Sequence, residues 1–189
     1  MHEYSCKGGN RDKVYLATLV ISAMIAFGVM YLIDWLVGGI HIVLDFLIFV
    51  ISLGPLTFWA LFAKRYSGLL LKLSGVPNCS GVYKGTLKSV YDKFEEEYSV
   101  TITINHQFRM MEIIVKTETS ESLSKTATVK LDGNRVEIVY TYENRGSMEK
   151  GLNRHIGTCI LTIEGKQIYG QYYTHPDRSN YGEINASKD

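Results

Sequence analysis

The last third of the chain gathers aromatic, basic and hydroxyl side chains of types that suit a small anionic ligand with flat rings. Ten such residues lie between positions 140 and 178: Tyr140, Tyr142, Arg145, Arg154, His155, Thr158, Tyr169, Tyr172, Tyr173 and Arg178. Tyrosine rings can stack on bases, and the planar guanidinium group of arginine matches a phosphate. Tyrosine is also common in strands, so the cluster is equally compatible with an ordinary sheet surface. A nucleotide-like anion is therefore one candidate ligand.

Residues that could catalyse a reaction or hold a metal form no recognisable arrangement. His155 and Cys159 could share a zinc ion on a helix, but on a strand they lie about 13 Å apart along one face. The sequence contains no P-loop, GxGxxG, HExxH, EF-hand or CxxC motif. We therefore expect no enzyme activity, no catalytic residue, no metal site and no cofactor. The three cysteines show no paired spacing, which argues against a disulfide framework and suits a reducing compartment.

The elements that would position the cluster are short β-strands. Apolar and polar side chains alternate along several segments after residue 80, which is the pattern of half-buried strands. We expect eight strands, near residues 82–91, 97–107, 109–118, 123–131, 135–143, 154–164, 166–174 and 180–186. Tight turns between sequential strands favour an up-and-down barrel, because closure removes both exposed sheet edges. A sandwich of two sheets is the alternative.

The first third of the chain has the composition of membrane helices. Residues 14–33 form a run of 20 uncharged residues and residues 46–63 a run of 18, each long enough to cross a hydrocarbon core about 30 Å thick. A signal peptide is the alternative, but the first run is too long, no A-x-A-like site follows it, and a second run comes at once. Lysine and arginine flank the two runs and are absent from the loop between them. The positive-inside rule then places both termini in the cytoplasm.

The fold class that follows is a membrane-anchored all-β protein, with two N-terminal transmembrane helices followed by a cytosolic eight-stranded up-and-down barrel. We expect a cytosolic tail at 1–13, a transmembrane hairpin at 14–63, a connector at 64–80 and a ligand-sensing barrel at 81–189. From residue 64 onward the chain has 17 Lys/Arg against 15 Asp/Glu. This balance argues against polymeric nucleic acid as a partner, because such binding needs a basic surface. The lipid bilayer is an expected partner.

Three motifs add a resemblance to a known family. They are Ser80-Gly81-Val82-Tyr83-Lys84-Gly85-Thr86-Leu87, His155-Ile156-Gly157-Thr158 and Tyr169-Gly170-Gln171-Tyr172-Tyr173-Thr174, and they are followed by Arg178 and Gly182-Glu183-Ile184. Together with two N-terminal membrane helices, this arrangement resembles the two-transmembrane, β-strand-rich effectors associated with bacterial CD-NTases in the CBASS anti-phage systems.

The resemblance implies a sensor anchored in the bacterial inner membrane whose barrel binds a cyclic oligonucleotide made by a partner CD-NTase. Binding would drive assembly of a homo-oligomer, and the helices would disrupt the membrane and kill the infected cell. Under this hypothesis we predict that a cyclic dinucleotide contacts Arg145, His155, Thr158, Tyr172 and Arg178, with arginine on phosphates and tyrosine or histidine on bases. Two other classes stay open: a membrane-tethered, lipocalin-like module for a lipid or other hydrophobic ligand, and a protein that binds a partner through an exposed apolar patch.

Overall fold

The computed structural model describes residues 1–37, 63–145, 155–175 and 180–188. These residues belong to two compact units, which we describe separately. The barrel unit comprises residues 1–9 and 77–189, and the helical unit comprises residues 10–76.

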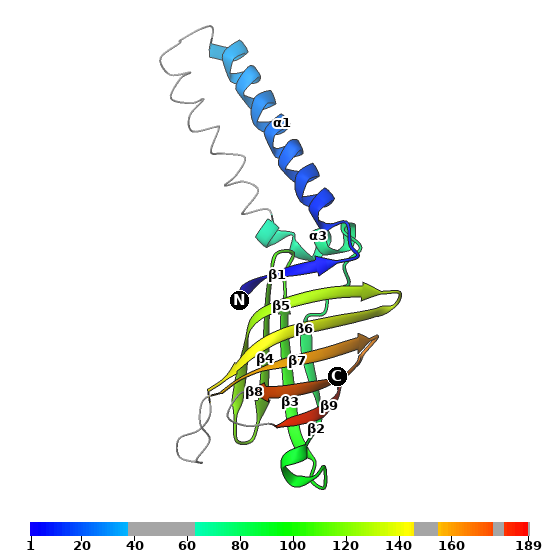
Figure 1. The fold of residues 1–189 in the computed structure, drawn as a ribbon. Helices are drawn as coiled ribbons and strands as arrows, with labels where there is room; N and C mark the ends of the chain where they lie inside the picture. Colours follow the sequence, from blue (N-terminus) through cyan, green and yellow to red (C-terminus); the bar gives the residue numbers. More distant parts are fainter. Residues whose placement is uncertain (38–62, 146–154, 176–179, 189) are drawn as a thin grey trace. The chain divides into compact units, whose positions relative to one another are not determined.

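Within the described residues, the strands of the barrel unit close on themselves (Figure 1). Their bounds are β1 His2–Lys7, β2 Gly81–Ser89, β3 Tyr98–His106, β4 Met110–Thr117, β5 Glu121–Asp132, β6 Arg135–Asn144, β7 His155–Glu164, β8 Gln167–His175 and β9 Tyr181–Lys188. From β2 to β9 each strand pairs antiparallel with the next, and β9 pairs antiparallel with β2. All eight strands expected from the alternation form, with ends within two residues of the predicted ones. The closed barrel excludes the two-sheet sandwich.

The ninth strand, β1, corrects two predictions, namely that residues 1–13 are a tail and that the barrel has eight strands. β1 lies between β4 and β5 and closes the barrel there. It pairs in parallel with β5, from Tyr4 opposite Ala127 to Lys7 opposite Lys130, and antiparallel with the start of β4. Its partner residues are more than 100 positions away in sequence. The segment HEYSCK is short and contains neither a turn nor a long alternation from which this pairing could be predicted.

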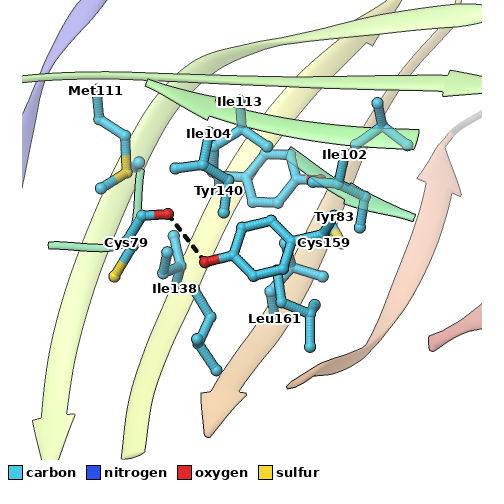
Figure 2. Packing of buried hydrophobic residues seen from close by; sticks show 14 of the residues in the cluster. Cys79, Tyr83, Ile102, Ile104, Met111, Ile113, Ile138, Tyr140, Cys159 and Leu161 are labelled. Atoms are coloured by element: carbon cyan, nitrogen blue, oxygen red, sulfur yellow. Dashed lines mark hydrogen bonds between the residues drawn. The ribbon is translucent and has the colours of Figure 1, made fainter. Parts of the chain in front are cut away.

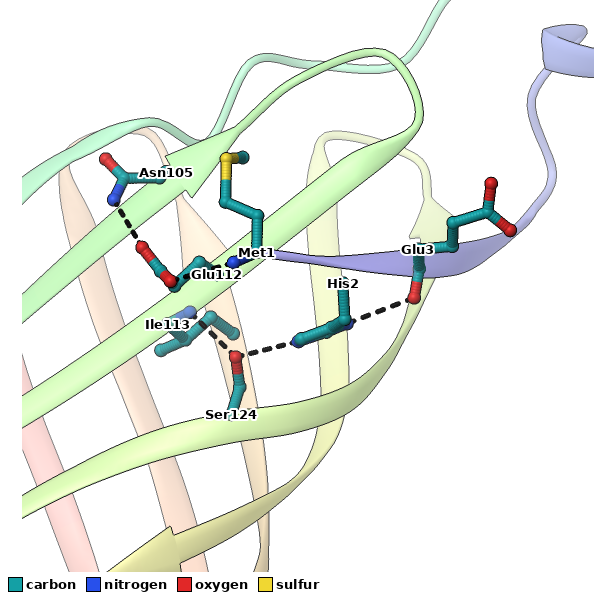
Figure 3. A network of polar contacts seen from close by, with 7 residues as sticks. All are labelled: Met1, His2, Glu3, Asn105, Glu112, Ile113 and Ser124. Carbon is teal, nitrogen blue, oxygen red and sulfur yellow. Dashed lines mark hydrogen bonds and ion pairs between the residues drawn. The ribbon is translucent and has the colours of Figure 1, made fainter.

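Polar contacts at the start of β1 join it to its neighbours (Figure 3). The imidazole of His2 lies 2.8 Å from the hydroxyl of Ser124 on β5. On the other side, the amino group of Met1 and the amide of Asn105 both donate to the carboxylate of Glu112, at 2.9 and 3.0 Å. These two hydrogen bonds, the first more than the second, lower the pKa of Glu112 below its ordinary value. The start of β1 is thus held at the surface from both sides.

Apolar side chains fill the barrel below its open end (Figure 2). Inward residues alternate along β3, β4 and β7 among others. The most deeply buried side chains include Ile102, Ile104, Ile113, Ile138 and Leu161, each no more than 1% exposed. The ring of Tyr83 also packs in this core, and its hydroxyl donates to the carbonyl of Cys79 at 3.1 Å. This packed core gives the open end a rigid floor.

The helical unit contains two described helices, α1 (Arg11–Val37) and α3 (Ser67–Leu73). The helix predicted at 14–33 forms as part of α1. Over Arg11–Val29, α1 is long and apolar enough to cross a membrane, judged by length and composition. The second predicted span, at 46–63, lies outside the described residues except at its end, and the helix α3 lies in the predicted connector.

Tyr4 anchors β1 in the barrel core, and removing its hydroxyl group tests whether β1 is part of the barrel. Its side chain is buried, and its hydroxyl donates to the carbonyl of Phe108 at 3.3 Å and lies 2.9 Å from Nε2 of the buried His106. Tyr4→Phe should lower the free energy of unfolding by about 1–2 kcal/mol, because two buried polar groups lose this partner.

The control for Tyr4→Phe is Ser5→Ala in the same strand, which removes an exposed hydroxyl 2.8 Å from that of Thr128. We expect Ser5→Ala to change stability by no more than about 0.5 kcal/mol. Both variants are compared by chemical denaturation of the full chain in detergent. Equal losses for the two would contradict the placement of Tyr4 in the core.

Candidate ligand site at the barrel mouth

One end of the barrel opens into a cavity of about 1010 Å³. We call this end the mouth; it lies where β2, β4, β6 and β8 end and where β3, β5, β7 and β9 begin. Val115, Cys159 and Ile184 line its deeper part, and polar residues from the strand ends line its rim. Small-molecule sites occupy roughly 300–1,000 Å³, so the mouth has room for a ligand the size of two joined nucleotides.

Two tyrosines of the mouth pack against glycines of the neighbouring strands. Tyr142 of β6 lies opposite Gly157 of β7, and Tyr172 of β8 lies opposite Gly182 of β9. A Cβ atom at Gly157 would lie 2.4 Å from the ring of Tyr142, and one at Gly182 would lie 2.5 Å from the ring of Tyr172. Side-chain atoms do not approach so closely, so each ring can lie over its neighbouring strand only because that strand has glycine there. The glycine of the His155-Ile156-Gly157-Thr158 motif therefore positions an aromatic ring.

The aromatic side chains of the mouth form a connected group. The ring of Tyr142 lies 6.2 Å from that of Tyr140 and 6.4 Å from the imidazole of His155, the latter nearly edge-on. Burial raises the pKa of Tyr142 and Tyr172 above the ordinary value of a phenol, and raises the pKa of the Cys159 thiol to about 12. These groups therefore keep their protons at physiological pH. The mouth offers neutral rings and hydroxyl donors, and its thiol is not a thiolate nucleophile.

Charge in the mouth is uneven around the barrel. Among the described lining residues, the carboxylates are Glu97, next to β3, and Glu118, between β4 and β5. Glu97 is paired with Lys88 at 3.0 Å. Arg145 directly follows Asn144 of β6, which pairs with His155 of β7 and with Ser122 of β5, and the backbone N–H of Arg145 donates to the carbonyl of Glu121 at 3.0 Å. A phosphate would be repelled by the two carboxylates and attracted to the guanidinium group of Arg145.

The structure brings together part of the predicted binding set. His155 and Tyr172 both line the mouth, and the exposed Arg145 follows the last residue of β6. Thr158 lies on the outward face of β7, the opposite face from His155, and does not line the cavity. Arg178 lies outside the described residues. Both faces of β7 carry apolar side chains, so alternation alone did not show which face is inward.

Sequence reasoning did not include Tyr142 or the polar rim in the binding set. Ser89 donates to the side-chain oxygen of Asn180 at 3.0 Å, and Thr174 donates to its backbone carbonyl at 3.0 Å. Tyr142 could have been found from its position, because it shares the inward face of β6 with Ile138 and Tyr140. The rim residues lie at strand ends, where alternation gives no direction.

The comparisons with known proteins concern this same unit. The model of a protein family described as "Cap15, cyclic dinucleotide receptor domain" matches residues 74–188, which is more than half of the chain and includes every barrel strand except β1. A comparison with curated proteins gave no match. The Cap15 family is a family of CBASS effectors, so the resemblance seen in the sequence motifs is confirmed. This chain belongs to the Cap15 cyclic dinucleotide receptor domain family.

Proposed function

We propose that this chain is a membrane-anchored CBASS effector that senses a cyclic dinucleotide at the barrel mouth. The observation that carries the proposal is the tyrosine-lined cavity of about 1010 Å³, whose lining lies wholly within the residues that match the receptor domain. Tyr142 and Tyr172 would each stack on a base, and the hydroxyl and amide groups of the rim would bind ribose and phosphate oxygens. The ligand would be made by a partner CD-NTase.

The phosphates of the ligand need positive charge that the described lining does not supply. The charged side chains of that lining are Glu97 and Glu118. Arg145 and Arg178 therefore remain our candidates for the phosphates, and Arg145 directly follows β6, the strand that carries Tyr142. His155 would lie between the phosphates and the stacked bases.

Membrane anchoring is supported by α1 together with the connectivity of the barrel. β1 precedes the helical unit in sequence, and β4 and β5, which hold it, follow that unit. Both ends of the helical unit must therefore lie on the same side of any membrane that it crosses. If α1 crosses once, a second crossing must follow, and the uncharged residues 46–63 have the composition for it. Lysine and arginine at both ends of the unit favour the cytoplasmic side of the inner membrane.

Self-association of the chains would couple ligand binding at the mouth to the action of the helices in the membrane. A ligand shifts an equilibrium between single and associated chains only by its differential affinity for the two states. A ligand held 100-fold more tightly by the associated state would supply about 2.7 kcal/mol per site. Confinement to a bilayer raises the effective concentration of neighbouring chains. The associated helices would then disrupt the inner membrane and abort the infection.

The proposal is tested by melting the full chain in lipid nanodiscs against a panel of cyclic dinucleotides and trinucleotides. A ligand present at 100 times its Kd should add about 2.7 kcal/mol and raise Tm by roughly 10 °C. The linear dinucleotide of the same bases serves as the control. A folded chain whose Tm no member of the panel changes would contradict the sensor, and a shift with fatty acids instead would favour the lipocalin-like alternative.

The effector step is tested separately in vesicles that contain the full chain and a quenched dye. The cyclic dinucleotide that raises Tm should release the dye, and its linear counterpart should not. Binding of the cyclic dinucleotide without release of the dye would agree with the sensor function and contradict membrane disruption.

A further inference from the structure

β1 lies in a slot between β4 and β5 that is closed at one end. At the mouth end, β4 and β5 pair directly, from Ile114 opposite Leu123 to Lys116 opposite Glu121. Toward the other end they diverge, and β1 fills the gap (Figure 1). The slot therefore has backbone hydrogen-bonding groups on both sides, and an extended segment satisfies them.

β1 is the least firmly paired strand of the described barrel. It is aligned with β4 at two positions and with β5 at four, whereas β2 and β3 are aligned at seven. Tyr4 is its one buried residue. His2 contacts the buried hydroxyl of Ser124, and Cys6 packs partly buried against the core. The Arg109–Glu3 ion pair is exposed, and such pairs contribute little to stability. Release of β1 therefore requires withdrawal of one large side chain and loss of few backbone contacts.

The connection from β1 to the first helix is short. Three residues, Gly8-Gly9-Asn10, separate β1 from α1, and they span at most about 11 Å. Gly8 has a φ of 97°, a conformation that favours glycine. A chain that brings its α1 beside the α1 of a neighbour must therefore bring its β1 into the neighbourhood of a second slot.

From these observations we propose that the β4–β5 slot is a docking site for β1 of a second copy of this chain, so that associated chains exchange β1 strands. The exchanged strand makes the same contacts as the chain's own strand, so the pairing itself changes little in free energy. The chain's own β1 is favoured by its short tether, and a neighbour's β1 competes only where chains are concentrated. This inference rests on the proposed function in one respect, because the ligand is expected to bring the chains together.

The side chains of Ser5 and Thr128 provide a direct test, because their hydroxyls lie 2.8 Å apart across β1 and β5. One chain carries Ser5→Cys and a second carries Thr128→Cys, each with Cys6→Ser and with tags of different mass. Both are reconstituted into the same vesicles under mild oxidation. Neither chain can form this bond alone, so a linked heterodimer requires β1 of one chain to lie against β5 of the other.

The native Cys79 and Cys159 stay in place, because burial raises the pKa of each thiol to about 12 and leaves little reactive thiolate. The matched control mixes a Thr126→Cys chain with a Thr141→Cys chain. Their hydroxyls lie 2.7 Å apart across β5 and β6, which we do not expect to separate. A single chain with both Ser5→Cys and Thr128→Cys verifies that the bond can form within the barrel.

The expected result is a Ser5→Cys/Thr128→Cys heterodimer several-fold more abundant than the control heterodimer, increasing with chain density and with the cyclic dinucleotide. A heterodimer no more abundant than the control at the highest density would overturn the proposal, as would failure of the single chain to form its internal bond. Tm is measured on the same vesicles. A ligand-induced shift without the heterodimer would overturn strand exchange alone, and a heterodimer without any shift would support exchange and contradict the sensor.

Discussion

Replacing Tyr172 with alanine should weaken binding of the cyclic dinucleotide by about 1–3 kcal/mol, or roughly 5- to 150-fold in Kd. The ring of Tyr172 lines the mouth and lies over Gly182 on the neighbouring strand. Stacking needs a flat face held in place, and glycine at that position allows the ring to lie close to β9. Kd is measured by titration calorimetry on the full chain in detergent, with the ligand identified by the thermal panel.

The adjacent Tyr173 gives a matched control for this prediction. Tyr173 lies on the outward face of β8 and is 45% exposed. Tyr173→Ala should leave the affinity unchanged, and Tyr172→Phe should keep most of it because the ring remains. Tm without ligand shows whether each variant is folded. If the folded Tyr172→Ala protein binds the ligand as tightly as the parent, Tyr172 does not contribute to the binding site.

Replacing Leu161 with alanine should lower the free energy of unfolding by about 2–5 kcal/mol. Leu161 is 0% exposed and belongs to the core beneath the mouth. Its removal leaves a cavity that surrounding strands cannot easily fill, because the backbone of a closed barrel is fixed by hydrogen bonds on both sides. Chemical denaturation of the full chain, followed by circular dichroism, measures the loss.

The neighbouring Ile160 points outward and is 36% exposed, so it serves as the control. Ile160→Ala removes a side chain of similar size and should reduce stability by no more than about 1 kcal/mol. Losses of equal size for the two variants would contradict the inward and outward faces assigned to β7.

The sequence predicted the antiparallel strands and their closure into a barrel, but not the ninth strand of that barrel. The strands from β2 to β9 were predictable because several of them alternate in polarity and each pairs with the next along the chain. β1 was not, because it is short and its parallel pairing with β5 depends on residues far away in sequence. Local patterns report which face of a strand is buried, but they carry little information on distant partners.

The sequence showed which types of side chain gather at the candidate site, but only some of the residues that line it. Tyr172 and His155 were found because aromatic and titratable side chains are conspicuous, and both line the mouth. Thr158 was placed with them although it faces outward, since β7 is apolar on both faces. Tyr142 was left out although alternation places it on the inward face of β6 with Tyr140, whereas its position opposite Gly157 depends on the register of the sheet. Which face is inward is decided by closure of the barrel, and therefore by packing between strands.

The position of β1 also sets the order in which the chain can finish folding. β1 is synthesised before its partner strands, and Ser5 lies 123 residues ahead of its partner Thr128. At about 5–20 residues per second, synthesis of the intervening chain takes roughly 6–25 s. The whole helical unit is made during this interval, so if it crosses the membrane as proposed, we expect it to do so before the barrel can close. A chain that inserted with an odd number of crossings would leave β1 on the far side of the bilayer, and closure therefore occurs only in chains of correct topology.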